Sequence, residues 1–150
     1  MTSAIPIPNV PKKVEVLAVS GDETELDSLR CLFAGSSWGF RTARTLTEVL
    51  EWLSRNETPV VLCDSSLPRG DWKELLRLTT EMAHSPCIVV VARLADDRLW
   101  SEVINLGGYD VLVLPAKPAE VLRTVSGALR SWHDRFDRQP IAVRRHACSE

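Results

Sequence analysis

Few side chains in this 150-residue chain have the types and spacing that chemistry would require. The histidines His84, His133 and His146 are widely separated and lack the spacing with cysteine or aspartate that a zinc site needs. The four cysteines form no CxxC pair, and we expect reduced thiols, with Cys63 a core residue. The remaining candidates for a functional site are carboxylates and hydroxyls that directly follow apolar runs. Asp64 is the first of them to consider.

These carboxylates do not form an enzymatic pattern. The string SGDET at 20–24 has donors for a phosphate, but Asp22 and Glu23 would repel one, and no glycine-rich fingerprint is present. A DxD phosphatase would need a second acid two residues after Asp64, where Ser66 stands. We therefore expect no enzyme, and a flavodoxin-like ligand-binding protein or enzyme is kept only as a third alternative.

The polar residues follow short apolar runs that alternate with amphipathic segments. Most runs are continuous, as in strands of a parallel sheet that is covered on both faces; they span 14–19, 40–43, 60–63, 87–92 and 111–114. Asp22, with Glu25 three residues later, predicts the N-cap of the first helix. Five β-α units predict an α/β fold with a doubly wound, five-stranded parallel sheet. Ligands of such sheets bind where the strands end.

Composition limits the classes of protein that fit. The chain is 45% hydrophobic and 25% charged with a net charge of −2, which is typical of a globular domain and gives no electrostatic footprint for nucleic acid. No apolar run is long enough for a membrane span, and the proline-containing start is not a secretory signal. We expect a cytoplasmic protein without membrane contact: a leader at 1–12, one domain at 13–134 and an arginine-containing tail at 135–150.

The string VVLCDSSLPRGDW at 60–72 resembles the centre of response-regulator receiver domains, with an apolar strand, an Asp, a Pro four residues later and an Asp three beyond. The strings PCIVVVAR at 86–93 and GGYDVLVLPAKPAEVL at 107–122 resemble the last third of these domains. They include a GG turn and, at Pro115, the place of the family's cis-proline. The resemblance covers about residues 13–134 and implies a CheY-like, flavodoxin-like (βα)5 sandwich.

The resemblance implies that Asp64 is the phosphoacceptor, which takes a phosphoryl group from a histidine kinase with the help of Mg²⁺. The family's acidic pair after the first strand, which holds this ion, reads Ser20 and Gly21 here. Asp22, Asp64 and Ser66 are therefore the candidate ligands for a weakly bound Mg²⁺.

The other switch positions of the family are apolar in this chain. The hydroxyl after the fourth strand is replaced by Val91, the aromatic switch residue by Val111 and the lysine by Leu114, with Lys117 three residues later. Loss of one preorganised charge-stabilising group typically costs about 2.7–4 kcal/mol in the transition state. These substitutions predict an atypical or pseudo-receiver.

The resemblance also implies a partner surface that combines the helix near 97–106, the strand 111–114 and the helix near 119–129. Its expected residues are Trp100, Val103, Leu112 and Val121. We predict a stand-alone receiver-like signalling module of a two-component phosphorelay, which contacts a histidine kinase or a downstream signalling protein and forms a homodimer through this face. Two alternatives stay open: a phosphotransfer receiver rescued by Asp22 or Glu23 and Lys117, and a phosphorylation-independent interaction or scaffold domain.

Overall fold

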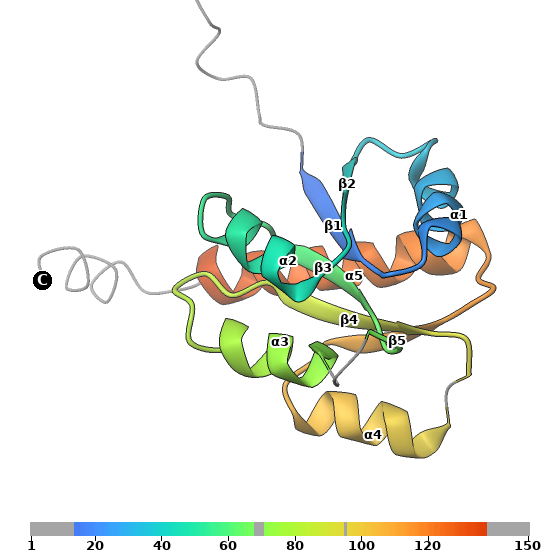
Figure 1. The fold of residues 1–150 in the computed structure, drawn as a ribbon. Coiled ribbons are helices and arrows are strands. Elements are labelled where there is room, and N and C mark those ends of the chain that lie inside the picture. The colour runs from blue at the N-terminus through green and yellow to red at the C-terminus, as the bar shows by residue number, and fades with distance from the viewer. Residues whose placement is uncertain (1–13, 68–70, 95, 138–150) are drawn as a thin grey trace, which may run out of the picture.

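The computed structural model describes residues 14–67, 71–94 and 96–137 (Figure 1). Strands and helices alternate along this part of the chain. In order they are β1 (Glu15–Val19), α1 (Glu23–Phe33), β2 (Gly39–Ala43), α2 (Leu46–Leu53), β3 (Val60–Asp64), α3 (Asp71–Thr79), β4 (Cys87–Ala92), α4 (Asp97–Asn105), β5 (Asp110–Val113) and α5 (Pro118–Asp137).

The strands form one parallel sheet in the order β2-β1-β3-β4-β5. The central strands β3 and β4 are buried along their whole length, as their continuous apolar runs predicted. The register pairs Asp64 with Val91 and Val19 with Cys63. The carboxyl ends of β1, β3 and β4 therefore lie side by side. This confirms the predicted α/β fold class.

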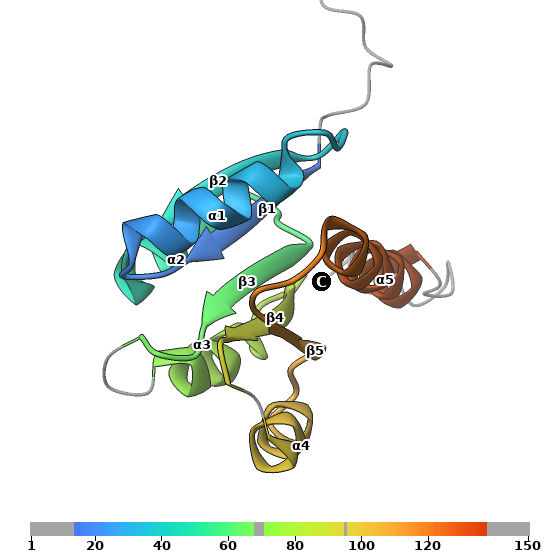
Figure 2. The ribbon, with the colours of Figure 1, turned by 90° about the vertical axis from the view of Figure 1, so that its right-hand side faces the viewer.

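Helices cover both faces of the sheet (Figure 2). Helices α1 and α5 pack on one face, where Leu26 and Val125 join the core. Helices α2, α3 and α4 pack on the other face, where Val49, Leu75 and Val103 are buried. The alternation of side chains along each strand therefore supplies two apolar layers, one on each side of the sheet.

Three helices begin at the polar residues that their sequence favours. Asp22 caps α1, Thr45 caps α2 and Asp96 caps α4, each by accepting a hydrogen bond from a backbone N–H of the first turn. The Asp22 cap agrees with the prediction.

The turn before β5 requires two glycines for different reasons. Gly107 has a φ of 101°, a conformation that favours glycine. At Gly108 an added Cβ would lie 2.5 Å from Val103 Cγ1 and 3.0 Å from the Val103 carbonyl oxygen. The backbone can pass this close to α4 only because no side chain is present.

The last helix, α5, ends beyond the expected end of the domain at residue 134. It continues to Asp137, three residues beyond position 134. The leader at 1–12 and the tail beyond residue 137 lie outside the described residues. In the part of the chain that is described, no helix combines the length and apolarity needed to cross a bilayer.

Candidate functional site

Asp64 at the end of β3 is buried, with 7% of its surface exposed, and both of its carboxylate oxygens are hydrogen-bonded within the protein. Its Oδ2 accepts the Ser20 hydroxyl at 2.7 Å. Its Oδ1 accepts the backbone N–H of Ser66 at 2.9 Å and the Ser66 hydroxyl at 2.7 Å. Three donors from Ser20 and Ser66 therefore hold this carboxylate in place.

A second acid, Glu25 of α1, lies beside Asp64. Only 3% of Glu25 is exposed, and its Oε1 is 3.2 Å from the Ser20 hydroxyl oxygen, which also bonds to Asp64. The expected capping role of Glu25 is wrong, because the backbone N–H of Asp22 bonds to Ser20 Oγ at 3.0 Å instead. Sequence reasoning gave Glu25 only a capping role and missed its place beside Asp64, although its spacing of four from Leu29 places it on the buried face of α1.

The pKa values of the two acids are shifted in opposite directions. Burial, the hydrogen bond to Asp64 and the charge of Asp64 raise the pKa of Glu25 to about 7. Burial also acts to raise the pKa of Asp64, but hydrogen bonds from Ser66, Ser20 and Glu25 outweigh it and hold that pKa below its ordinary value. Near neutral pH Asp64 is therefore ionised, whereas Glu25 keeps its proton to a higher pH than an ordinary glutamate does.

Arg93, the first residue after β4, completes the group. Its Nε lies 3.6 Å from Glu25 Oε2. The Arg93 side chain is 60% exposed, whereas that of Glu25 is almost fully buried, so this ion pair joins a buried acid to a cation at the surface. We call Ser20, Glu25, Asp64, Ser66 and Arg93 the Asp64 cluster.

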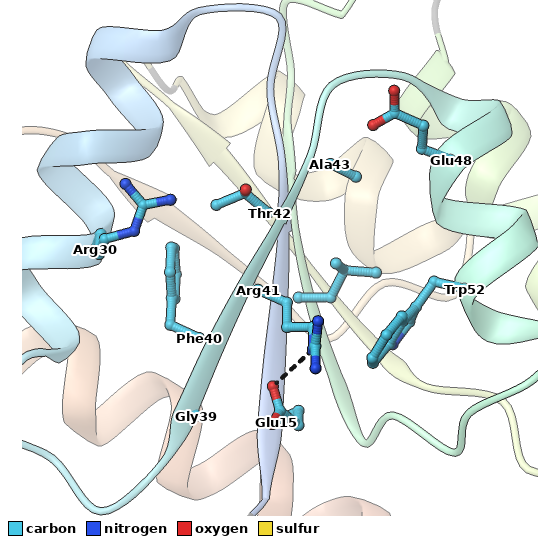
Figure 3. Close-up of a pocket in the computed structure, with 10 residues that line it drawn as sticks. Glu15, Arg30, Gly39, Phe40, Arg41, Thr42, Ala43, Glu48 and Trp52 are labelled. Carbon is cyan, nitrogen blue, oxygen red and sulfur yellow. Dashed lines mark ion pairs between the residues drawn. The ribbon is translucent and has the colours of Figure 1, made fainter.

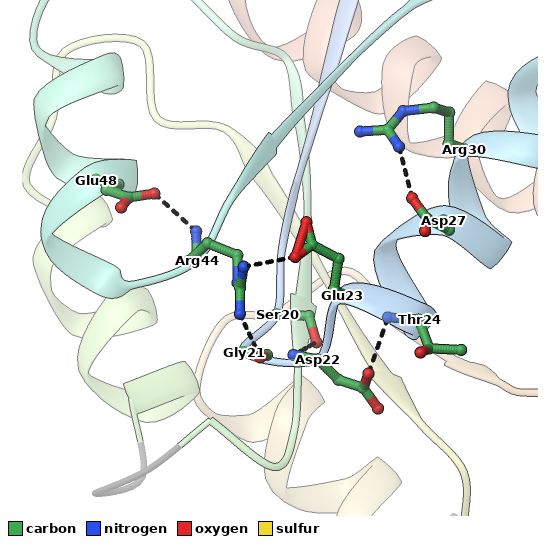
Figure 4. A network of polar contacts seen from close by, with 9 residues as sticks. All are labelled: Ser20, Gly21, Asp22, Glu23, Thr24, Asp27, Arg30, Arg44 and Glu48. Atoms are coloured by element: carbon green, nitrogen blue, oxygen red, sulfur yellow. Dashed lines mark hydrogen bonds and ion pairs between the residues drawn. The ribbon is translucent and has the colours of Figure 1, made fainter.

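The carboxylates expected to rescue metal binding have other partners (Figure 4). Asp22 accepts the backbone N–H of Thr24 at 2.9 Å and caps α1. Glu23 forms an ion pair of 3.0 Å with Arg44, which also donates to the Gly21 carbonyl oxygen. The carboxylates of Asp22 and Glu23 thus bond to groups outside the Asp64 cluster.

The residues at the family's switch positions, Val91, Val111 and Leu114, pack in the apolar layers of the fold. Val91 and Leu114 are buried in the layer beneath α1 and α5, and Val111 packs against the opposite layer. The peptide bond between Leu114 and Pro115 is cis. Lys117 is exposed at the start of α5, where its backbone N–H bonds the Glu120 side chain.

The residues present do not fit the Mg²⁺ ion that receiver domains typically bind. Among described residues, no three His, Cys, Asp or Glu side chains gather in a way that could hold a metal. Mg²⁺ needs oxygen ligands in near-octahedral geometry. Here the Asp64 oxygens already accept hydrogen bonds from Ser20 and Ser66, and Glu25 pairs with the guanidinium of Arg93.

Three of the four residues expected at the partner surface are core residues. Val103, Leu112 and Val121 are buried, because their positions face the sheet or, for Leu112, the layer beneath α5. Only Trp100, which is 50% exposed, lies at the surface. The correction follows from periodicity, since Val103 lies on the same side of α4 as Leu99.

Other apolar side chains take the place of the buried ones. Glu102 pairs with Lys73 of α3 at 2.8 Å, and a rotation of 100° per residue places Trp100 and Ile104 on the opposite side of α4, toward the edge strand β5. Val113 points to the same face of the sheet as Val111. Trp100, Ile104 (36% exposed) and Val113 (45% exposed) are named the α4–β5 patch.

A groove of about 540 Å³ crosses the other edge of the sheet, at β2 (Figure 3). Arg41 pairs there with Glu15 at 3.3 Å and lies 4.5 Å from the centre of the Trp52 ring. Arg30, which also lines the groove, is held by Asp27 at 2.7 Å. Arg30 and Arg41 of this groove are therefore already paired within the protein. Asp64 does not line the groove.

Comparison with solved structures shows which proteins share this fold. No protein-family profile and no curated protein matches the sequence. A signal receiver domain of an HD domain-containing protein from Pseudomonas fluorescens Pf-5 is 26% identical, with a TM-score of 0.72, and the match covers 82% of this chain and 99% of that one.

Two further solved structures are similar over nearly their whole length. The chemotaxis response regulator CheY4 of Vibrio cholerae is 18% identical with a TM-score of 0.70, and 79% of this chain and 100% of that chain are covered. The beryllofluoride-activated NtrC4 receiver domain dimer is 23% identical with a TM-score of 0.72, and 79% and 98% are covered. The chain therefore has the (βα)5 fold of CheY-like receiver domains.

Proposed function

We propose that this chain is a two-component signalling module of the receiver type that binds partner proteins through α4, β5 and α5 without phosphorylation of Asp64. The similarity to receiver domains supports the signalling class. The state of Asp64 supports the absence of phosphorylation.

The observation that carries this proposal is the set of hydrogen bonds around Asp64. Phosphoryl transfer requires a carboxylate oxygen to approach phosphorus in line, with cations placed to neutralise the phosphoryl oxygens. In this chain Ser20 and Ser66 occupy the Asp64 oxygens, and Val91 and Leu114 supply no hydroxyl or ammonium group. Attack would break these hydrogen bonds before any compensating interaction formed.

The α4–β5 patch is the part of the surface suited to a protein partner. An exposed Trp beside aliphatic side chains is the composition that anchors many interfaces. The patch lies on the β5 edge of the sheet, and one similar structure is described as a receiver domain dimer, so a second copy of this chain is one such partner.

Intact mass spectrometry tests the phosphorylation state directly. The wild-type chain and Asp64→Asn are incubated with Mg²⁺ and acetyl phosphate, beside an ordinary receiver domain that serves as positive control. We expect an adduct on the control and none on either form of this chain. A phosphoryl adduct on the wild type that is absent from Asp64→Asn would instead establish the phosphotransfer alternative.

Quantitative affinity capture tests the surface. Wild type, Asp64→Asn and the double variant Trp100→Ser/Ile104→Ser are compared as baits in the native host. The proposal expects the same partner on wild type and Asp64→Asn, and its loss from the double variant. Loss on Asp64→Asn with retention on the double variant would contradict it.

A further inference from the structure

Arg93 places a positive charge next to the carboxyl groups of the Asp64 cluster. Among the described residues it is the one cation that an ion pair joins to this cluster, through Glu25. Its guanidinium lies beside Glu25, which in turn neighbours the buried Asp64 carboxylate. A divalent cation entering the same place would have to displace Arg93 or be repelled by it.

Arg93 also occupies a position that can connect the cluster to α4. It directly follows β4, and Asp96, the N-cap of α4, comes three residues later. Asp96 accepts the backbone N–H of Leu99 at 2.9 Å and so fixes the first turn of α4. The end of β4 is tied to β3 as well, because the Ser65 backbone N–H donates to the Val91 carbonyl oxygen at 2.9 Å.

We propose that Arg93 takes the place of the divalent cation of an ordinary receiver: its ion pair with Glu25 excludes metal from the Asp64 cluster and holds the start of α4 in one position. This inference rests on the proposed function, since it explains how the α4–β5 patch is kept ready for a partner without phosphorylation. Glu25 and Arg93 act as positioning residues, because neither is required to touch a reacting group.

The first experiment measures binding of Mn²⁺, as a probe for divalent cations, by electron paramagnetic resonance at pH 8. The variants are Arg93→Ala, Arg93→Gln, which keeps a polar side chain without the charge, and Arg93→Lys, which keeps the charge. Arg98→Ala is the matched control, because Arg98 is an exposed arginine of α4. Circular dichroism verifies that each variant is folded.

We expect Arg93→Ala and Arg93→Gln to bind Mn²⁺ at least about tenfold more tightly than wild type, a change equivalent to about 1.4 kcal/mol. Arg93→Lys and Arg98→Ala should bind as weakly as wild type. Equal Mn²⁺ affinity of wild type, Arg93→Ala and Arg93→Gln would overturn the exclusion of metal by Arg93.

The second experiment measures amide hydrogen exchange in α4. We expect faster exchange in the first turn of α4 in Arg93→Ala and Arg93→Gln, restored protection in Arg93→Lys and no change in Arg98→Ala. Unchanged exchange in both neutral variants would overturn the connection to α4. These results are independent of the acetyl phosphate assay: an adduct on the wild type refutes the proposed function, whereas the Arg93 results alone decide this inference.

Discussion

Ser20 at the end of β1 donates its hydroxyl hydrogen to Asp64 at the end of β3 across 2.7 Å, and so joins two neighbouring strands through their side chains. Both residues are buried. The hydroxyl has one hydrogen, and the shorter distance assigns it to Asp64 rather than to Glu25, which is 3.2 Å away.

Removal of this hydroxyl should destabilise the fold. Ser20→Ala leaves a buried carboxylate oxygen with one donor fewer, and we expect the free energy of unfolding to fall by about 1–3 kcal/mol in urea titrations. Ser66→Ala is the matched control, because its hydroxyl is exposed and its backbone N–H still donates to Asp64. Equal losses in the two variants would show that burial of the Ser20–Asp64 bond has no special weight.

Stability should decrease as the pH rises from about 4.5 to about 7. Glu25 has a raised pKa in the folded state, so the folded chain holds a proton that the unfolded chain has released in this interval. The contribution is complete below the unfolded pKa of 4.5 and is lost through the folded pKa of about 7, with an upper limit of about 3 kcal/mol.

Urea midpoints measured across this pH interval test the assignment. Glu25→Gln keeps a donor toward Asp64 but does not titrate, so its stability should be nearly constant where that of wild type declines. Asp64 acts in the opposite direction: because its pKa is lowered, its contribution is present above the unfolded value of 3.8 and is lost on further acidification. A wild-type decline that persists in Glu25→Gln would assign the titration to another group.

A methyl group at position 108 should not fit. Gly108→Ala places its Cβ against Val103 of α4, and overpacking of this kind costs about 1–3 kcal/mol. Gly21→Ala is the control, since an added Cβ there has no neighbouring atom within 4 Å. Thermal unfolding should show a lower midpoint for Gly108→Ala than for Gly21→Ala, and equal midpoints would contradict the close approach of the turn to α4.

The cysteines should differ in reactivity in the native state. Cys31 is exposed, whereas Cys63 and Cys87 are buried. Burial raises the pKa of the Cys87 thiol although Arg135 Nη2 lies 3.4 Å from its sulfur atom. Alkylation mapped by mass spectrometry should modify Cys31 before Cys63 and Cys87, which become reactive after unfolding. Rapid native modification of Cys87 would indicate local opening near the start of β4.

The central strands were predictable because their sequence carries one dominant signal. The runs at 60–63 and 87–92 are short, continuous and apolar, which is typical of strands covered on both faces. The edge strand β2 had a weaker run, yet its predicted span differs from Gly39–Ala43 by one residue. Order and spacing of the strands thus predicted the sheet.

The Asp64 cluster was only partly predictable. Asp64 follows a buried strand, but Glu25 has the spacing of a capping residue, and local pattern cannot tell a capping glutamate from one that turns inward to another acid. Arg93 gave no signal beyond its place after a strand. The prediction that Val103, Leu112 and Val121 lie at the surface assigned whole helices and strands to the interface. Each element exposes only one of its faces, and these three residues are buried.

The hydrogen bonds that occupy both oxygens of Asp64 have a consequence for how information could be carried. A covalent mark lets one polypeptide exist as two species whose ratio records a past stimulus. A chain without that mark is a single species, and its occupancy by a partner follows from the two concentrations and their dissociation constant. Its output would then be set by synthesis, degradation and competition for the partner, on the timescale of protein turnover.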